Sequence, residues 1–85
     1  MPIVLRYKGY RFFFFSNEGN PLEPAHIHVR NGARTAKYWI APEVMLADSY
    51  ELNPSELKEI EKVVREHQAL MREVWNDNFS GHGSS

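Results

Sequence analysis

Two histidines, His26 and His28, stand two residues apart in the stretch EPAHIHVRNGARTAKYWI, residues 23–40. Imidazole titrates near neutral pH, so a histidine pair can act as base and acid in phosphodiester cleavage. Lys37, in the same stretch, would then stabilise the negative charge that develops on the phosphate. These three residues form our candidate catalytic set, for a metal-independent ribonuclease. The alternative interpretation is that both histidines are ordinary polar residues on a solvated strand.

The His-x-His spacing also suits a metal ion, but two imidazoles need at least a third ligand. Glu18 and Glu23 are candidates for that ligand, whereas His67 is expected on the opposite side of the fold. The chain contains no cysteine. The spacing alone carries little weight, and we therefore assign neither a metal ion nor a cofactor. For His67 we expect a buried side chain that hydrogen-bonds to a backbone carbonyl or a loop carboxylate.

Both histidines are positioned by a predicted β-hairpin, with strands near residues 25–30 and 34–40. Asn31-Gly32 between them is a strong hairpin signal, because both residues tolerate positive φ. In a tight hairpin His26 lies opposite Lys37, and alternation then sorts the side chains onto two faces. Ile27 and its alternate neighbours face the core. The complementary face holds His26, His28, Arg30, Thr35, Lys37 and Trp39. A loop with an odd number of residues would disperse this cluster.

A second hairpin is predicted from residues 3–7 and 10–16, joined through Lys8-Gly9. Its second strand contains four consecutive phenylalanines, residues 12–15, which alternation divides between the two faces. One pair fits beneath a helix, and the other pair lies beside Arg11 on the face of the histidines. Exposed aromatic pairs indicate a partner, a second copy of the chain or stacked bases. A sheet curled enough to bury both pairs is the alternative.

The second half of the chain predicts helix. Pro42 suggests a short helical turn within residues 41–52. A long helix begins at Asn53, with Pro54 at its first position and Glu56 completing a capping box, and its apolar stripe continues to Trp75. Four strands followed by a helix predict a two-layer α+β fold. One antiparallel sheet of about four strands packs on a single long C-terminal helix.

The composition is that of one soluble globular domain, since 42% of the 85 residues are hydrophobic and 25% are charged. We assign it to residues 1–79, with a flexible tail at 80–85. Without a signal peptide or a long apolar run, the chain is expected to be cytoplasmic and unattached to membranes. A domain of this size is marginally stable alone, which favours a dimer or a partner protein.

Charge is distributed unevenly along the chain. The first forty residues contain six basic and two acidic side chains, a balance of +4, and the remainder contains four basic and nine acidic ones, a balance of −5. Such asymmetry suggests that the first half meets an anion. A solvated helix face accounts for the acidic half but leaves the basic excess unexplained.

Several stretches resemble a family of short bacterial proteins classed as a domain of unknown function. They are G-Y-R-F-x-F-x-S-N-E at residues 9–18, P-x-H-I-H-V at 24–29, A-K-x-W at 36–39, and Glu66-His67. Ala25 departs from the pattern, because family members commonly have a second proline there. The resemblance implies a prokaryotic cytoplasmic protein but no established activity. It also implies a second small gene beside this one, in a toxin–antitoxin-like arrangement, and hence a small protein partner.

Two functions follow from these observations. The first is a non-enzymatic binding module that recognises the adjacent-gene protein, a second copy of itself or nucleic acid. Its expected binding residues are Arg11, Glu18, Arg30, Thr35 and Trp39. The second is a ribonuclease-like toxin that uses His26, His28 and Lys37. An overall pI near 6.4 favours the first function, although a local basic face suffices for RNA.

Overall fold

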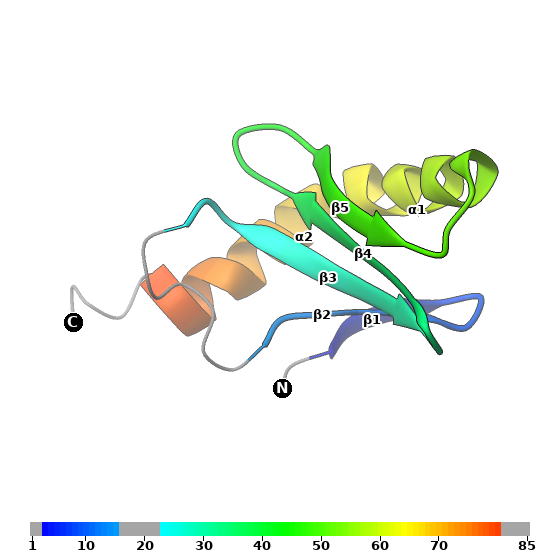
Figure 1. Ribbon diagram of the computed structural model, residues 1–85. Coiled ribbons are helices and arrows are strands. Elements are labelled where there is room, and N and C mark those ends of the chain that lie inside the picture. Colours follow the sequence, from blue (N-terminus) through cyan, green and yellow to red (C-terminus); the bar gives the residue numbers. More distant parts are fainter. Residues whose placement is uncertain (1–2, 16–22, 81–85) are drawn as a thin grey trace.

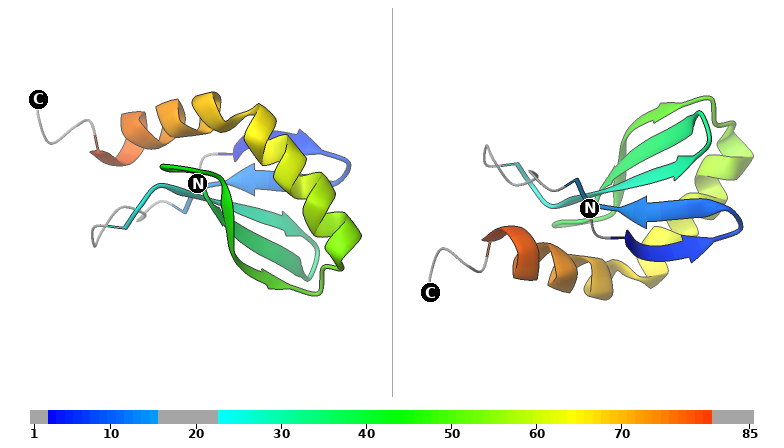
Figure 2. Two further views of the ribbon diagram at one scale, coloured as in Figure 1. Left: turned by 90° about the horizontal axis from the view of Figure 1, so that it is seen from above. Right: turned by 90° about the horizontal axis from the view of Figure 1, so that it is seen from below.

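The computed structural model describes residues 3–15 and 23–80, and within these ranges five strands precede the helices. In chain order the elements are β1 (Ile3–Tyr7), β2 (Tyr10–Phe13), β3 (His26–Asn31), β4 (Arg34–Trp39), β5 (Met45–Tyr50), α1 (Pro54–Glu66), α2 (Gln68–Trp75) and the π-helical turn η1 (Asn76–Ser80). The strands form one antiparallel sheet in the order β1-β2-β3-β4-β5. Figures 1 and 2 show the helices along one side of this sheet. We call the other side the open face.

The predicted α+β class with an antiparallel sheet is confirmed, but two of its details are wrong. The sheet has five strands among the described residues rather than about four, and the helix is divided into α1 and α2. The short helical turn predicted within residues 41–52 is also wrong, because Met45–Tyr50 forms strand β5. This edge strand pairs with β4 along one side, which satisfies backbone groups that would otherwise remain unpaired.

Both predicted hairpins form, and their turns explain why. Lys8 and Gly9 have φ angles of 48° and 84°, so both central residues of the first turn are left-handed, as a type I′ hairpin requires. In the second turn the central residues are Gly32 and Ala33, and of these Gly32 has a positive φ, 64°. A positive φ at the first central residue alone is the pattern of a type II′ turn, for which glycine is preferred.

Helix α1 begins as the sequence predicts. The Asn53 side chain accepts a hydrogen bond from the Glu56 backbone N–H at 2.8 Å, and the Glu56 carboxylate accepts one from the Asn53 N–H at 2.9 Å. Pro54 occupies the first helical position, where its missing N–H has no intrahelical partner to lose. The capping box is therefore confirmed.

His67 separates the two helices. Its Nδ1–H donates to the Val63 carbonyl at 2.9 Å, and its backbone N–H lies 3.1 Å from the same oxygen and 3.2 Å from the Val64 oxygen. The backbone N–H of His67 is therefore divided between two carbonyls, which distorts the regular helical hydrogen bonding. The helix axis changes direction at this point (Figure 2). Hydrogen bonding of His67 to a backbone carbonyl is confirmed, although the residue is half-buried rather than fully buried.

The core lies between the helices and the inner face of the sheet. It includes Phe12, Phe14, Ile27, Val29, Tyr38, Ile60, Val64, Met71 and Trp75. Each fully buried side chain of this size contributes about 1.5–3 kcal/mol relative to exposure. The phenylalanine pair expected beneath the helix is thus confirmed, since Phe12 and Phe14 are both fully buried.

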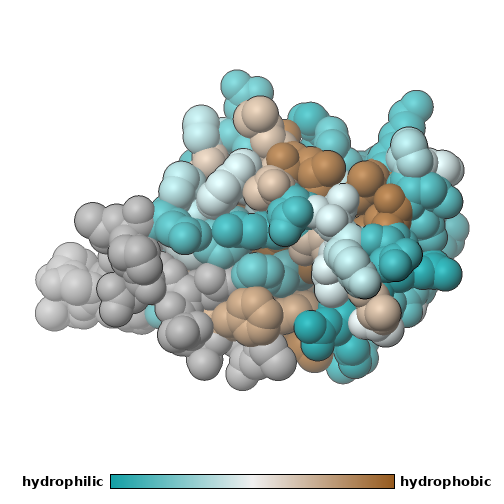
Figure 3. Space-filling model, in the orientation of Figure 1, coloured by the Kyte–Doolittle hydropathy of each residue, from teal (hydrophilic) through white to brown (hydrophobic). Residues whose placement is uncertain are grey.

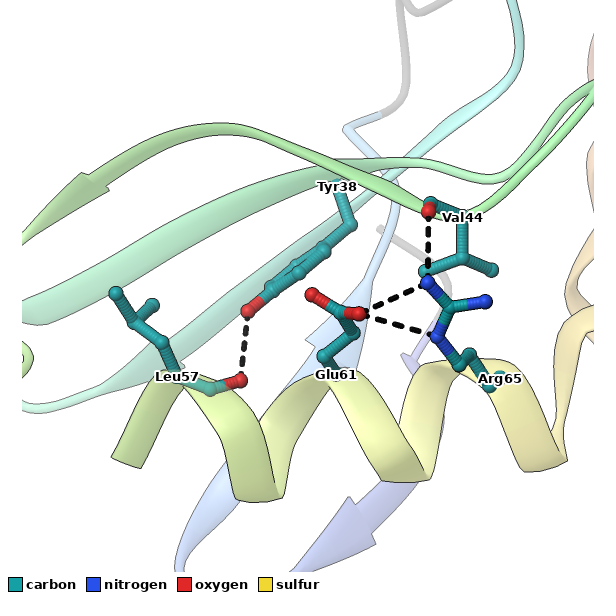
Figure 4. A network of polar contacts seen from close by, with 5 residues as sticks. All are labelled: Tyr38, Val44, Leu57, Glu61 and Arg65. Atoms are coloured by element: carbon teal, nitrogen blue, oxygen red, sulfur yellow. Dashed lines mark hydrogen bonds and ion pairs between the residues drawn. The ribbon is translucent and has the colours of Figure 1, made fainter. Parts of the chain in front are cut away.

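Polar contacts tie β4 and the residue that precedes β5 to α1 (Figure 4). The Tyr38 hydroxyl donates to the Leu57 carbonyl at 2.9 Å, and burial raises the pKa of this phenol to about 12, with a smaller contribution from the negative charge of Glu61. Arg65 donates to Glu61 and also reaches the Val44 carbonyl, 3.4 Å away. These bonds hold the sheet and helix in one orientation, which leaves the opposite side of β4 for the open face.

Within the described ranges, no helix is long and apolar enough to cross a membrane.

Candidate functional site

The open face is organised as rows of side chains that run across the strands. The β3–β4 register places His26 opposite Trp39, His28 opposite Lys37 and Arg30 opposite Thr35. All six residues predicted to share a face therefore do so. This side of the sheet is the one seen in Figures 1 and 3, where hydrophilic side chains gather over the strands and hydrophobic ones surface beside them.

The predicted cross-strand partners are wrong by two residues. A turn centred on Asn31-Gly32 predicts His26 opposite Lys37 and His28 opposite Thr35. The turn instead lies at Gly32-Ala33, one residue further along the chain. Because both turns contain two residues, the even–odd pairing is preserved and the face keeps its membership.

His26 is buried despite its position on the open face, with 1% of its surface exposed. Its Nδ1–H donates to the Pro24 carbonyl at 3.0 Å. Its ring lies 5.0 Å from Trp75, at the end of α2, and 5.6 Å from Trp39. The sheet and helix layers meet at this end of β3, so His26 serves as a packing residue between them.

His28 is partly exposed and forms the centre of an aromatic group. Its ring lies 5.8 Å from Phe13, in a stacked arrangement, and 4.4 Å from Phe15. Phe13 is buried, whereas 39% of Phe15 is exposed. Phe15 is therefore exposed, as one interpretation of the second phenylalanine pair predicts, whereas Phe13 is buried, as the alternative predicts. A hollow of about 240 Å³ lies between these rings and the side chains of Lys37 and Asp48.

Lys37 is held by two neighbours. Its ammonium lies 4.7 Å from the centre of the Trp39 ring and 3.6 Å from a carboxylate oxygen of Glu23. The same oxygen lies 3.6 Å from Nδ1 of His26, so Glu23 joins the histidine and lysine ends of the cluster. The sequence suggests Glu23 only as a candidate metal ligand. Its position three residues before His26, in the segment entering β3, is the signal that could have placed it here.

Three arginines lie side by side on the same face. Arg6 pairs with Arg11 across β1 and β2, and Arg11 pairs with Arg30 across β2 and β3. All three are exposed. Thr35 and Tyr50 continue the row across β4 and β5. We call Arg6, Arg11 and Arg30 the arginine row.

The arginine row differs from four other cationic side chains of the described residues, each of which is paired with a carboxylate. Lys8, Arg34, Lys37 and Arg65 each lie within 4 Å of a carboxylate. Among residues 3–15 and 23–80, no ion pair is found for any member of the row. Sequence reasoning predicted Arg11 and Arg30 but missed Arg6. The Lys8-Gly9 turn could have revealed it, since a two-residue hairpin places Arg6 opposite Arg11.

The described part of the chain contains no group of three or more histidine, cysteine, aspartate or glutamate side chains arranged to hold a metal ion. His67 bonds within the helical layer, on the opposite side of the sheet from His28. Glu18, a predicted binding residue and candidate ligand, lies outside the described residues.

A protein-family model described as a domain of unknown function, DUF4160, matches residues 9–76. The chain belongs to this family. The match spans most of the chain and includes β2 to α2, with His28, Lys37 and two members of the arginine row. No curated protein and no solved structure matches the chain. The family supplies no activity, so the function must be inferred from the open face itself.

Proposed function

We propose that this DUF4160 protein is a non-enzymatic binding module whose open face docks a negatively charged partner, either a protein or a nucleic acid. The observation that carries the proposal is the arginine row. Guanidinium groups bind carboxylates and phosphates through paired hydrogen bonds, and they are weakly hydrated, so they suit this task better than lysine. One form of such a partner is the product of a neighbouring small gene.

Placing these three positive charges together does not stabilise the fold. Like charges directly opposite on neighbouring strands destabilise a sheet, and the row contains two such pairs, Arg6–Arg11 and Arg11–Arg30. Each pair costs several tenths of a kcal/mol, by the magnitude of cross-strand interactions, roughly 0.2–1 kcal/mol. Anionic groups of a partner would remove this repulsion and replace it with attraction.

The ribonuclease alternative receives less support from the geometry. A general base must come within hydrogen-bond reach of the proton that it removes. His26 is 1% exposed and donates its Nδ1–H to Pro24, so a phosphodiester on the open face does not reach it without rearrangement. His28 and Lys37 remain accessible and directly paired, but they fit ligand contact as well as catalysis.

The proposal is tested with two charge-matched double variants. Arg11→Gln with Arg30→Gln removes two charges from the open face, and Lys58→Gln with Lys62→Gln removes two from the exposed surface of α1. Fluorescence anisotropy would follow binding to a labelled poly-glutamate peptide and to a labelled RNA oligonucleotide. We expect at least one probe to bind, the open-face variant to lose this binding, and the α1 variant to keep it. Equal losses in the two variants, or binding of neither probe by the wild type, would contradict the proposal.

Enzyme activity is tested separately by incubating purified protein with labelled RNA. We expect the wild type to leave the RNA intact. Cleavage that disappears in the His26→Ala, His28→Ala double variant would instead establish the ribonuclease function.

A further inference from the structure

We propose that the outer edge of β5 is a second docking site, where an extended peptide segment rich in basic and apolar residues adds one strand to the sheet. This site goes beyond the proposed function, because the arginine row lies on β1, β2 and β3, and β4 separates it from β5. In Figure 1, β5 forms the upper border of the sheet. The two sites can therefore be tested independently.

The backbone of β5 presents hydrogen-bonding groups along its outer side. The strand is last in the sheet order and, among the described residues, pairs only with β4. In an antiparallel pair every second residue points its N–H and C=O away from the neighbouring strand, so a strand of this length presents about three of each. Edge strands are commonly protected by lysine, proline or a bulge. Met45–Tyr50 contains neither lysine nor proline, and its one register shift leaves regular pairs with β4 on both sides.

Large apolar side chains are exposed along this edge. Met45, Leu46 and Tyr50 are 60%, 41% and 61% exposed, and they make up half of the six exposed large hydrophobic residues in the described part of the chain. A hollow of about 220 Å³ lies at the start of the strand, lined by Pro24, Trp39, Ala41, Pro42, Glu43 and Met45. When a peptide adds a strand to a sheet, its backbone bonds supply affinity and such hollows select its side chains.

Acidic side chains determine the charge that suits the added strand. Residues 41–57 contain four acidic side chains and no basic one. Three of the four are exposed and have no ion pair within the described ranges, namely Glu43, Asp48 and Glu51. Lys37 lies opposite Asp48 in the sheet register, but its ammonium contacts Glu23. Lysine or arginine on an incoming strand would therefore meet uncompensated negative charge.

The two sides of the added strand would meet different side chains of β5. Met45, Asp48 and Tyr50 lie opposite open-face residues of β4, and so they share the open-face side. Leu46 lies opposite the buried Tyr38, on the side of the helices. Because side chains alternate along a strand, basic residues beside Asp48 and apolar residues beside Leu46 would alternate in the peptide. The Tyr50 ring can also accept a cation.

A second copy of the chain and a nucleic acid fit this edge less well. Asp48 lies near the middle of β5, so pairing of two copies of the strand would bring two Asp48 carboxylates together. Like charges on neighbouring strands are destabilising. The same carboxylates would repel the phosphates of a nucleic acid. A basic, apolar segment of a partner protein satisfies the backbone groups, the apolar side chains and the charge together.

The test measures binding of the complete chain to a fluorescein-labelled peptide of eight alternating valine and lysine residues, by fluorescence anisotropy. We expect saturable binding. Replacing one central valine of the peptide by proline keeps the charge but removes a backbone donor, and should weaken binding at least 5-fold. Amide hydrogen exchange of alternate residues in β5 should slow when the peptide is bound, because their outward N–H groups become hydrogen-bonded.

Two charge-matched double variants locate the site on the protein. Asp48→Asn with Glu51→Gln should weaken binding about 2- to 30-fold, by the magnitude of two exposed ion pairs. Glu66→Gln with Glu73→Gln, which alters exposed carboxylates of α1 and α2, should leave the affinity unchanged. Absence of binding, equal binding of the proline peptide, or equal losses in the two variants would overturn the inference.

Sedimentation of the protein alone tests a second copy as the occupant. We expect Leu46→Lys, which places a charge on the exposed edge, to leave the association state unchanged. A dimer that this substitution dissociates would show that β5 pairs with a second copy, and would overturn the inference. None of these outcomes alters the arginine row, so the proposed function stands or fails by its own test.

Discussion

Replacing Arg11 with glutamate should make the protein more stable while weakening the proposed binding of a negatively charged partner. Arg11 is the middle member of the arginine row and lies directly opposite Arg6 on one side and Arg30 on the other. A carboxylate at this position turns two repulsive cross-strand pairs into two attractive ones. Its side chain is exposed and belongs to no core contact, so the substitution changes charge rather than packing.

The expected gain follows from the two pairs that change. Opposite-charge cross-strand pairs contribute roughly 0.2–1 kcal/mol each, so Arg11→Glu should raise the free energy of unfolding by about 0.5–2 kcal/mol at low salt. A gain of about 1 kcal/mol corresponds to a Tm rise of roughly 4–8 °C for a domain of this size. Arg11→Gln, which removes repulsion without adding attraction, should give a smaller rise.

Urea unfolding followed by tryptophan fluorescence measures this effect, since Trp39 and the buried Trp75 both pack against His26, where the sheet and the helices meet, and both lose these surroundings on unfolding. The measurement is repeated at about 1 M salt, where the Debye length of roughly 3 Å screens exposed charges. The difference between wild type and variant should then largely disappear. A loss of stability at low salt, or a gain that persists undiminished at high salt, would refute the electrostatic account of the row.

Three further predictions concern the scaffold. Because burial raises the pKa of Tyr38 to about 12 whereas an unfolded tyrosine ionises near pH 10, the wild type should lose roughly 2–3 kcal/mol of stability between pH 10 and 12. Tyr38→Phe should lack this loss but be about 0.5–1.5 kcal/mol less stable at pH 7, because its bond to Leu57 is absent; urea unfolding at pH 8, 10 and 12 checks both. Asn53→Ala should lower the free energy of unfolding by about 1 kcal/mol through loss of the helix cap, measured by urea unfolding and by helical circular dichroism. Gly9→Ala should destabilise by about 1–2 kcal/mol, because φ is 84° and the added Cβ would lie 3.2 Å from the Asn31 amide; an unchanged Tm would contradict this.

The membership of the open face could be predicted because it depends on parity alone. Alternation within β3 and β4 separates His28 from Ile27, and any two-residue turn joins the faces correctly. The exact partners depend on which two residues form the turn. Gly32-Ala33 suits a type II′ turn, whereas Asn31-Gly32 suits a type I′ turn. The local sequence therefore does not decide which of the two pairs of residues forms the turn.

Strand β5 and the burial of His26 could not be predicted, because both depend on contacts distant in sequence. Residues 45–50 show no alternation of apolar and polar side chains, and they become a strand by pairing with the free edge of β4. His26 has the alternation of an exposed residue and is covered by Trp75, which arrives from the far end of the helical layer. The start of α1 was predictable because its capping box is local, whereas the break at His67 interrupts an apolar pattern that continues through it.

The most direct test of the arginine row as an anion site is a ¹⁵N NMR titration of the intact protein with tripolyphosphate. Such an anion is small enough to report where negative charge binds, independently of any base or polypeptide. We predict saturable shifts of the amide resonances of Arg6, Arg11 and Arg30 and of their neighbours in β1, β2 and β3. Shifts centred instead on Lys58 and Lys62 of α1, or the absence of any saturable site, would contradict the account.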